Sequence, residues 1–483
     1  MNITVQLELD NSKINNFSEL EKFAFKIAQE VGRKIAKSYL ENVDQMLKET
    51  RDKKRYRSKG KRKTSIKTIL GVITFEREIY ADQAAPESLR HVYLLDQELE
   101  ITTIGQVSEE ICQYVATSIC ESTFRDTARQ IVEMTGMSIS SQGVWNVVQQ
   151  MGIRQKKVVE RHTELAEKDQ SLGVLESKIL YEENDGIWLH LQGKDRKENG
   201  KTKEMKVGIT YDGVSCQKVG KKVRRTLADK IAYASFEKAK QFRKHKEGLL
   251  RSRYNTDETE VRVVNGDGAR WIFGGKRNSI CVLDKFHRNK MMRACIRDEE
   301  FLHLCEELLY DGRIEDLLNC IDAQRNSVED EDEKEALGNL YRYYKDNENA
   351  LTDYYSRGIA IPETRDPQLH HARLGSMESN VFTLIGNRMK GRRACWSIQG
   401  ANHLAALLCA YHTIGFEHLF SSLPPKPQEE PEEEANSFLH AGQIPSRIGH
   451  GYAFPNNVSI PLGEPWLANI AKGYVSFTDM SFI

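Results

Sequence analysis

Two aspartates that follow strand-like runs, and a glutamate that opens a helical run, most constrain what this chain can fold into. Asp185 lies in an Asn-Asp-Gly motif, Asp267 lies in Gly-Asp-Gly, and Glu378 begins an amphipathic stretch. Carboxylates brought together in this way suit a pair of divalent cations about 4 Å apart, which can activate a nucleophile and stabilise a leaving oxygen at a phosphodiester. The alternative is that each Asp-Gly pair is a surface turn in which the aspartate bonds its own backbone.

The charge of the chain is balanced overall but uneven along its length. The 483 residues give room for about three domains. Lys and Arg number 70, as do Asp and Glu, which argues against a uniformly basic surface. Residues 51–67 and 218–225 are nevertheless strongly basic, and residues 429–434 are strongly acidic. Such runs are solvated loops by default, but the basic ones also suit phosphate contact, because Lys and Arg bound to DNA release condensed counterions.

The cysteines and the apolar runs indicate a cytosolic protein. The nine cysteines are scattered without a CxxC pair, which predicts reduced thiols rather than a disulfide framework or a zinc ribbon. The N-terminus lacks the pattern of a signal peptide, and no run approaches the roughly 18 apolar residues needed to span a bilayer. We therefore expect a cytoplasmic protein with no membrane partner.

The N-terminal third has two helical regions and a strand region. Residues 17–48 form an amphipathic helix by the spacing of apolar residues that include Ile35 and Tyr39, and residues 68–80 alternate like a strand pair around Gly71. Farther on, a helix from Phe124 closes at Thr135-Gly136, and a second helix follows a possible cap at residues 138–141.

The layout of these two later helices is that of a helix-turn-helix, with an ordinary helical hairpin as the alternative. Polar side chains that suit a groove-facing helix are Ser141, Gln142, Asn146 and Gln149. A charged connector is expected at residues 154–168.

The rest of the chain alternates strands and helices. Strands are predicted at residues 178–192, 205–211, 260–267 and 279–283, and the highly charged residues 297–357 have a helical period throughout. The helix of Glu378 has an apolar stripe formed by Met377, Val381, Leu384 and Ile385. Cationic residues follow this stripe at Arg388, Lys390, Arg392 and Arg393.

Six passages occur in an order that is typical of one family. They are GVITFEREIY, TGMSISSQGVWNVVQQMG, ENDGIWLHLQ, NGDGARWI, VLDKFHRNK and GSMESNVFTLIGNRMKGRRACWS. Together they resemble the RNase H-like DDE transposases, and more narrowly the bacterial insertion-sequence transposases of the ISLre family, which is also catalogued as an uncharacterised protein family. The resemblance extends from about Gly71 to about His412.

This resemblance implies an α/β RNase H-like catalytic core with an all-α insertion and an N-terminal helical region of helix-turn-helix type that binds DNA. The implied domains are an N-terminal helix and basic arm at 1–90, the helix-turn-helix region at 91–168, the first part of the core at 169–293, the helical insertion at 294–371, the catalytic Glu helix at 372–420, and a Pro/Glu-rich linker with a C-terminal tail at 421–483.

The resemblance also implies the roles of individual residues. Asp185, Asp267 and Glu378 would be catalytic and would hold two Mg²⁺ ions, with Mn²⁺ as the alternative ion. Asp284 and His287 form a DxxH element near the active site, and we interpret both as supporting residues, with a catalytic role as the alternative. Trp396 could stack on an extruded base or pack in the core. Expected DNA contacts are Lys59, Lys61, Arg62, Lys63, Gln142, Asn146, Gln149, Arg388, Lys390, Arg392 and Arg393.

The implied activity is DNA transposition. A DDE transposase binds the ends of its insertion sequence, cleaves the strands, and joins the released 3′ hydroxyl to target DNA by in-line phosphoryl transfer. Double-stranded DNA would be the partner, with assembly of a homodimer or higher oligomer on the DNA, and the protein would associate with the bacterial nucleoid. The alternatives are an RNase H-fold nuclease or resolvase that only hydrolyses, an inactive DNA-binding relative, and a scaffold protein.

Overall fold

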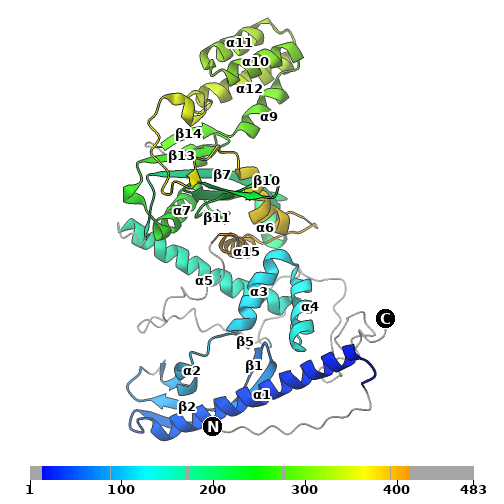
Figure 1. Ribbon diagram of the computed structural model, residues 1–483, viewed down its shortest axis with the longest axis vertical. Helices are drawn as coiled ribbons and strands as arrows, with labels where there is room; N and C mark the ends of the chain where they lie inside the picture. The colour runs from blue at the N-terminus through cyan, green and yellow to red at the C-terminus, as the bar shows by residue number, and fades with distance from the viewer. Residues whose placement is uncertain (1–13, 87–88, 169–172, 275–278, 392, 414–483) are drawn as a thin grey trace. The chain divides into compact units, whose positions relative to one another are not determined.

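The computed structural model describes residues 14–86, 89–168, 173–274, 279–391 and 393–413, which belong to two compact units (Figure 1). The described residues up to Met151 form the first unit, and those from Gly152 onward form the second. The expected linker and tail at 421–483 lie outside the described residues. Across these ranges, no helix combines the length and the apolar character that crossing a membrane requires.

The first unit contains a five-stranded sheet with the order β3-β2-β1-β5-β4. Its elements in chain order are α1 (Phe17–Thr50), β1 (Tyr56–Thr68), β2 (Gly71–Asp82), β3 (His91–Val92), α2 (Leu94–Glu98), β4 (Thr103–Ile104), β5 (Val107–Ser108), α3 (Glu109–Glu121), α4 (Phe124–Thr135) and the start of α5 (Ser141–Glu167).

The basic stretch is a strand and not a loop. We expected a strand pair within residues 68–80, but β2 occupies this region as one long strand, and its antiparallel partner is β1, the basic stretch itself. Gly71, with φ near 101°, makes the tight reversal between them possible. Ladder pairing uses backbone groups, so a run with few apolar side chains can pair with a strand that supplies the buried face. That face includes Ile73 and Phe75.

Helix α1 packs against the sheet by a different face from the one that its spacing indicated. Ala36, Leu40 and Val43 contact the cluster of Ile73, Phe75 and Leu95, whereas Ile35 and Tyr39 are exposed. A strict four-residue repeat advances about 400° per step on a helix with 3.6 residues per turn, so it drifts by about 40° each time. Over a helix of this length the predicted stripe therefore rotates away from the core.

The two helices predicted as a helix-turn-helix are present. Gly136 caps α4 with φ near 66°, and Ser140 accepts a hydrogen bond from the amide of Gly143 at the start of α5. The expected connector at 154–168 is wrong, because α5 continues to Glu167. Its charged residues lie on the solvated side, while Gln155, Val159 and Thr163, at four-residue spacing, are buried.

The second unit is built on a five-stranded mixed sheet with the order β11-β8-β7-β13-β14. Its elements after α5 are β6 (Leu175–Glu176), β7 (Ile179–His190), α6 (Gly193–Asn199), β8 (Thr202–Tyr211), β9 (Val214–Val219), β10 (Lys222–Leu227), β11 (Ile231–Ser235), α7 (Ala239–Arg253), β12 (Tyr254–Asn255), η3 (Thr256–Glu258), β13 (Val261–Gly266), α8 (Arg270–Phe273), β14 (Ser279–Leu283), α9 (Lys285–Cys295), α10 (Glu299–Tyr310), α11 (Ile314–Ser327), α12 (Glu331–Asp346), η4 (Glu348–Ala350), η5 (Tyr354–Arg357), β15 (Leu369–His370), α13 (Met377–Val381), the π-helical turn η6 (Phe382–Gly386), α14 (Asn387–Met389) and α15 (Ile398–Tyr411).

The pairing within this sheet has two parts. Strand β8 is antiparallel to both of its neighbours, β7 and β11, whereas β13 pairs in parallel with β7 and β14 pairs in parallel with β13. All four strands that the sequence predicted are present, and β14 matches its predicted range to the residue. Strand β11 and the hairpin of β9 and β10 were not predicted. The hairpin forms a separate three-stranded sheet with β15.

The region expected to be a helical insertion contains α10, α11 and α12. Helices α10, α11 and α12 lie together beyond α9 and β14 (Figure 1), and their apolar side chains form one cluster with Leu283 and Met292. This cluster connects the insertion to the last strand of the sheet.

Two glycines let helices approach one another closely behind the sheet. A Cβ at Gly152 of α5 would collide with the side chain of His403 of α15. A Cβ at Gly248 of α7 would lie 2.7 Å from Cα of Thr163 of α5. Neither position can therefore take a larger side chain without a shift of a helix.

We predict that Gly152→Ala and Gly248→Ala each lower the free energy of unfolding by about 2 kcal/mol or more, because overpacking displaces rigid neighbours. Gly338→Ala in α12 is the matched control: the nearest side chain is Arg325 at 3.6 Å, so alanine should gain up to about 1 kcal/mol of helix propensity there. Urea denaturation of the three variants measures the differences. Equal effects at all three positions would contradict the helix contacts.

Candidate active site

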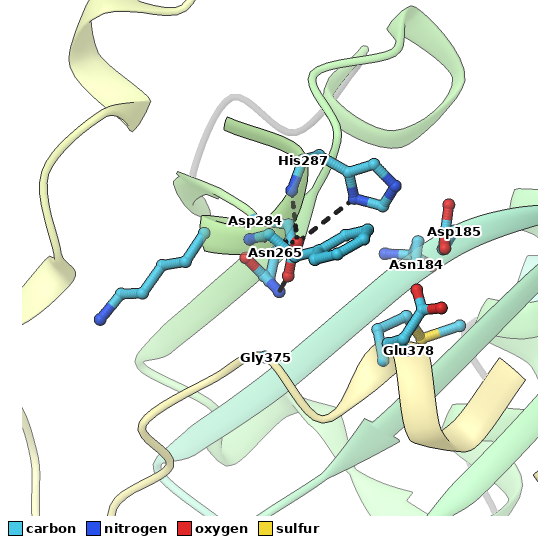
Figure 2. A pocket seen from close by; sticks show the side chains of 10 residues that line it. Asn184, Asp185, Asn265, Asp284, His287, Gly375 and Glu378 are labelled. Atoms are coloured by element: carbon cyan, nitrogen blue, oxygen red, sulfur yellow. Dashed lines mark hydrogen bonds and ion pairs between the residues drawn. The ribbon is translucent and has the colours of Figure 1, made fainter. Parts of the chain in front are cut away.

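One cavity in the second unit collects side chains from four separate segments. It has a volume of about 210 Å³, and its lining residues are Asn184, Asp185, Asn265, Asp284, Lys285, Phe286, His287, Gly375, Met377 and Glu378. Figure 2 shows the carboxylates of Asp185, from β7, and Glu378, from α13, on the same side of this cavity, with the ring of His287 across from them. Two of the three predicted acids thus share one cavity.

The electrostatic environment of Asp185 includes the third acid. Burial raises the pKa of Asp185 to about 6, and the negative charges of Asp267 and Glu378 add to this rise, while the amide of Gly186 and the ring of His287 oppose it. Asp267 does not line the cavity, but it is close enough for its charge to act on Asp185. A cation at this place would relieve the mutual repulsion of the three carboxylates.

Asp267 follows β13 in a turn that the helical insertion holds. Its carboxylate accepts a hydrogen bond from the amide of Ala269 at 2.9 Å, and its backbone carbonyl accepts one from the hydroxyl of Tyr343 at 2.8 Å. Gly268, with φ near 88°, lies against Asn347. Both Tyr343 and Asn347 lie at the end of α12, so the insertion supports the second acid of the site.

The segment that delivers Glu378 is anchored by a buried glutamate on β7. Glu183 is fully buried, and its Oε2 accepts hydrogen bonds from the amides of Gly375 at 2.8 Å and Ser376 at 3.0 Å. Leu374 and Gly375 both have positive φ, a tight turn that directs these two amides toward one point. The helix that begins at Met377 is thereby fixed to the strand that carries Asp185.

The same glutamate also joins the neighbouring strands. Tyr211 of β8 donates to its Oε1 at 2.7 Å, and Asn265 of β13 donates to its Oε2 at 3.0 Å. Burial raises the pKa of Glu183, although these donors lower it. The side chain of Glu183 therefore joins β8, β13 and the segment before α13 to its own strand, β7.

Asp284 and His287 form a hydrogen-bonded pair at the start of α9. Asp284 caps the helix by accepting from the amides of Phe286 and His287, and it faces Nδ1 of His287 at 3.2 Å (Figure 2). Asn265 donates to the other oxygen of Asp284 at 3.2 Å. Burial would raise the pKa of Asp284, but the bonds to His287 and Asn265 hold it below its usual value. The bond to Asp284 in turn raises the pKa of His287.

The residues expected to contact DNA lie in several places. Lys59, Lys61, Arg62 and Lys63 are exposed on β1, in the first unit. On α5, Gln142 is exposed and donates to Asn146 at 3.0 Å, and Gln149 is half-buried.

The cations beyond Glu378 differ in accessibility. Lys390 and Arg393 are exposed, Arg388 is half-buried with its guanidinium 5.6 Å from the centre of the Trp396 ring, and Arg392 lies outside the described residues. Trp396 is buried and donates to the carbonyl of Met389, which supports the expectation of core packing. The apolar stripe of Met377, Val381, Leu384 and Ile385 is buried as predicted.

The donor set of the cavity suits a hard cation, although it is not a closed cage. Among the described residues, no three His, Cys, Asp or Glu side chains converge tightly enough to form a metal-binding group. The acids that surround the cavity nevertheless offer carboxylate oxygens, which Mg²⁺ prefers, and Mg²⁺ commonly completes its shell with water and substrate phosphate rather than with protein groups alone. The residues therefore fit such an ion.

The sequence did not reveal three residues that shape this site. Glu183 and Asn265 lie two residues before Asp185 and Asp267, and their alternation along each strand is the only signal that points to them. The side chain of Glu204 on β8 lies against Gly186 and would have to move to admit a Cβ there, and burial raises its pKa, with a further rise from the charge of Asp267. Nothing in the sequence around Glu204 distinguishes it from other surface acids.

Comparison with known proteins places the chain beside sequences of one family. The model of the uncharacterised protein family UPF0236 matches residues 11–417. In Caldanaerobacter subterraneus subsp. tengcongensis, the UPF0236 protein TTE0610/TTE0881/TTE1053/TTE2432 is 26% identical over 398 residues, which cover 81% of this chain and 77% of the relative. A UPF0236 protein in the vanSb 3′ region of Streptococcus gallolyticus is 22% identical over 409 residues, covering 82% and 84%.

We predict that Glu183→Ala lowers the free energy of unfolding by about 3 kcal/mol or more, because it leaves several buried donors without an acceptor. Glu183→Gln should cost less, about 1 to 2 kcal/mol, because the amide oxygen can still accept the three N–H groups, while the hydroxyl proton of Tyr211 loses its acceptor. Hydrogen exchange at Gly375 and Ser376 is the local readout, and it should accelerate only in the alanine variant. Unchanged exchange in that variant would show that Glu183 does not hold this segment.

Proposed function

This chain belongs to the uncharacterised protein family UPF0236, whose name states no activity. From the site itself, we propose that the protein is a DNA transposase that cleaves at the ends of an insertion sequence and transfers the released strand. The observation that carries this proposal is the meeting of Asp185 and Glu378 in one cavity, with the charge of Asp267 acting on Asp185. Carboxylates from distant segments that lie near enough to repel one another are stabilised by a bound cation.

The topology of the central sheet supports an RNase H-like core. Its order, β11-β8-β7-β13-β14, combines an antiparallel meander with two parallel strands beside β7. Asp185 lies on the central strand β7, Asp267 follows the adjacent parallel strand, and Glu378 lies on a helix after an all-α insertion. This is the placement that the resemblance to DDE transposases implies.

The chemistry would depend on cations held by the three acids. A pair of Mg²⁺ or Mn²⁺ ions would supply Lewis-acid activation of a water or 3′ hydroxyl and stabilisation of the leaving oxygen. Glu183 and the insertion hold the backbone near Glu378 and Asp267, respectively, so the carboxylates are positioned before substrate arrives. Asp284 keeps His287 oriented beside Asp185, where a protonated ring adds positive charge near the scissile phosphate.

Other parts of the chain support DNA as the substrate. The first unit holds the exposed cations of β1 and the paired helices α4 and α5. In the second unit, Lys390 and Arg393 are exposed and follow Glu378 by 12 and 15 residues, and such cations suit charge-assisted bonds to a DNA backbone. One relative from Caldanaerobacter has a name that joins eleven locus designations, as a protein encoded by repeated copies of a mobile element would.

Strand transfer distinguishes transposition from the nearest alternative. The purified chain is incubated with Mg²⁺ and a duplex that carries the inverted repeats flanking its reading frame, together with a supercoiled target plasmid. A transposase should cleave at the repeat and join the new 3′ end to the plasmid. Cleavage without joining would support a nuclease or resolvase, and binding without cleavage an inactive relative.

We predict that Asp267→Asn lowers the rate of DNA cleavage at least about 1,000-fold, because an amide loses the charge that holds a cation. DNA affinity should change less than about threefold, since the amide oxygen still accepts from Ala269 and the fold is preserved. Asp257→Asn, at an exposed position of the same unit, is the matched control and should cleave like the parent. Cleavage by the Asp267 variant at the parental rate would exclude this site.

We also predict that the β1 cations and the α5 polar residues contribute differently to binding. Replacing Lys59, Lys61, Arg62 and Lys63 by Gln should make the slope of log affinity against log salt concentration shallower. The slope should change by up to about 0.9 for each phosphate that is no longer neutralised. Replacing Gln142 and Asn146 by Ala should instead erode the preference for element ends with little change in this dependence.

The readout is a binding titration at several salt concentrations on end-containing and random duplexes. Lys34 and Lys37 of α1 are ion-paired with Glu30 and Glu41, so neutralising them is the control for charge alone. An unchanged salt dependence in the β1 variant, with unchanged preference in the α5 variant, would refute the assignment of this region to end recognition.

A further inference from the structure

The hairpin of β9 and β10 is a basic ribbon that the site described above does not use. Every residue from Cys216 to Thr226 is exposed. The ribbon carries five cations, at Lys218, Lys221, Lys222, Arg224 and Arg225, and no acidic residue occurs between Asp212 and Asp229. None of the five cations forms an ion pair with an acidic side chain of the described residues. Their charge is therefore directed to solvent.

The cations occupy both faces of the ribbon. Arg224 pairs with Gln217, so these two share a face with Lys222, whereas Arg225 pairs with Cys216 and shares the opposite face with Lys218. A strand that packed on the protein would have one apolar face instead. Gly220, with φ near 60°, allows a two-residue turn at the tip, so the ribbon is narrow to its end.

The base of the ribbon is held rigidly. Arg365 bonds to Asp212, just before β9, and to Asp229, just after β10. Strand β15 extends the ribbon's sheet, with Leu369 beside Ser215.

The chain that leaves β15 leads to the candidate active site. His371 bonds to Tyr181 of β7 at 2.7 Å, Ala372 accepts from Tyr354 at 2.7 Å, and Gly375 bonds to Glu183. The ribbon and Glu378 are thus connected by a short segment that is anchored several times along its length. A ligand held by the ribbon would have a defined position relative to the cavity.

We propose that this ribbon enters the major groove of duplex DNA and contacts the phosphates on both sides of the groove. The inference rests on the proposed function, because it assigns a second contact surface to the same DNA. The major groove is about 12 Å wide and admits a two-stranded ribbon, whereas the minor groove, at about 6 Å, does not. Cations on both faces match the two phosphate backbones that border a groove, and Lys and Arg in such contacts bind largely without regard to sequence.

The test compares two variants of the full chain that lose the same charge. The first replaces the five ribbon cations by Gln. The second, a matched control, replaces five cations of the helical insertion and α9 that already have acidic partners, at Arg293, Arg297, Arg313, Lys334 and Lys345. Affinity for a random duplex is measured over a range of salt concentrations.

The ribbon variant should bind roughly 10-fold to 100-fold more weakly at moderate salt, and its dependence of log affinity on log salt should be shallower by about 2 or more. The control should stay within about twofold of the parent. A ribbon variant that bound like the parent would overturn the ribbon as a DNA contact and leave the proposed function intact. A parent chain that bound no duplex at all would overturn the proposed function, and the ribbon's role with it.

Two further measurements guard against indirect effects. Cys216 is the exposed cysteine among the described residues, and it should form a disulfide with a thiol tethered in the major groove of a duplex, whereas Cys216→Ser should not. Absence of this cross-link in a chain that binds the duplex would overturn the proposal. Light scattering of the ribbon variant should match the parent; a loss of self-association with unchanged DNA affinity would assign the ribbon to a second copy of this chain instead.

Discussion

The hydrogen bonds of one buried carboxylate, that of Glu183, organise the candidate active site. Tyr211, Asn265 and the amides of Gly375 and Ser376 all donate to it. Burying a carboxylate lowers the stability of the fold unless hydrogen bonds satisfy it, and the same holds for its buried donors. The fold is therefore stable only when all four donors reach this carboxylate. Because these donors come from β8, β13 and the entry to α13, satisfying this carboxylate also sets where Glu378 lies relative to Asp185. The relative positions of Asp185 and Glu378 thus depend on the buried hydrogen bonds of Glu183.

The helical insertion has a comparable role for the second acid. Its own apolar cluster includes Leu283 at the end of β14, and the hydroxyl of Tyr343 holds the turn that carries Asp267. Lys285 and Arg288 of α9 bond to Asp353 and to the carbonyl of Leu351, which follow α12. The insertion therefore does more than lengthen the chain between β14 and α13. Through Tyr343, it couples any movement of these helices to the turn of Asp267.

Acidic and basic side chains occupy different parts of the described chain. Burial raises the pKa of Asp185 in the cavity to about 6, and the negative charges of Asp267 and Glu378 add to this rise. Outside it, Lys390, Arg393 and the ribbon of β9 and β10 are exposed, and β1 contributes further cations in the first unit. A chain with no net charge can present such surfaces because its acids are concentrated elsewhere, including the acidic run at 429–434.

The sequence by itself determined the elements whose signals are local. Strand β14, the end of β13 just before Asp267, the buried stripe of the Glu378 helix and the cap at Gly136 follow from periodicity, glycine conformation and residue type within a few positions of the chain. It also singled out Asp185 and Glu378, which share a cavity. Only the tertiary structure decided that the basic stretch pairs with β2, which face of α1 is buried, and that Glu183, Asn265 and Glu204 surround the acids. These features depend on which distant segment lies opposite a residue, and backbone pairing and buried hydrogen bonds leave no local pattern that reveals the partner.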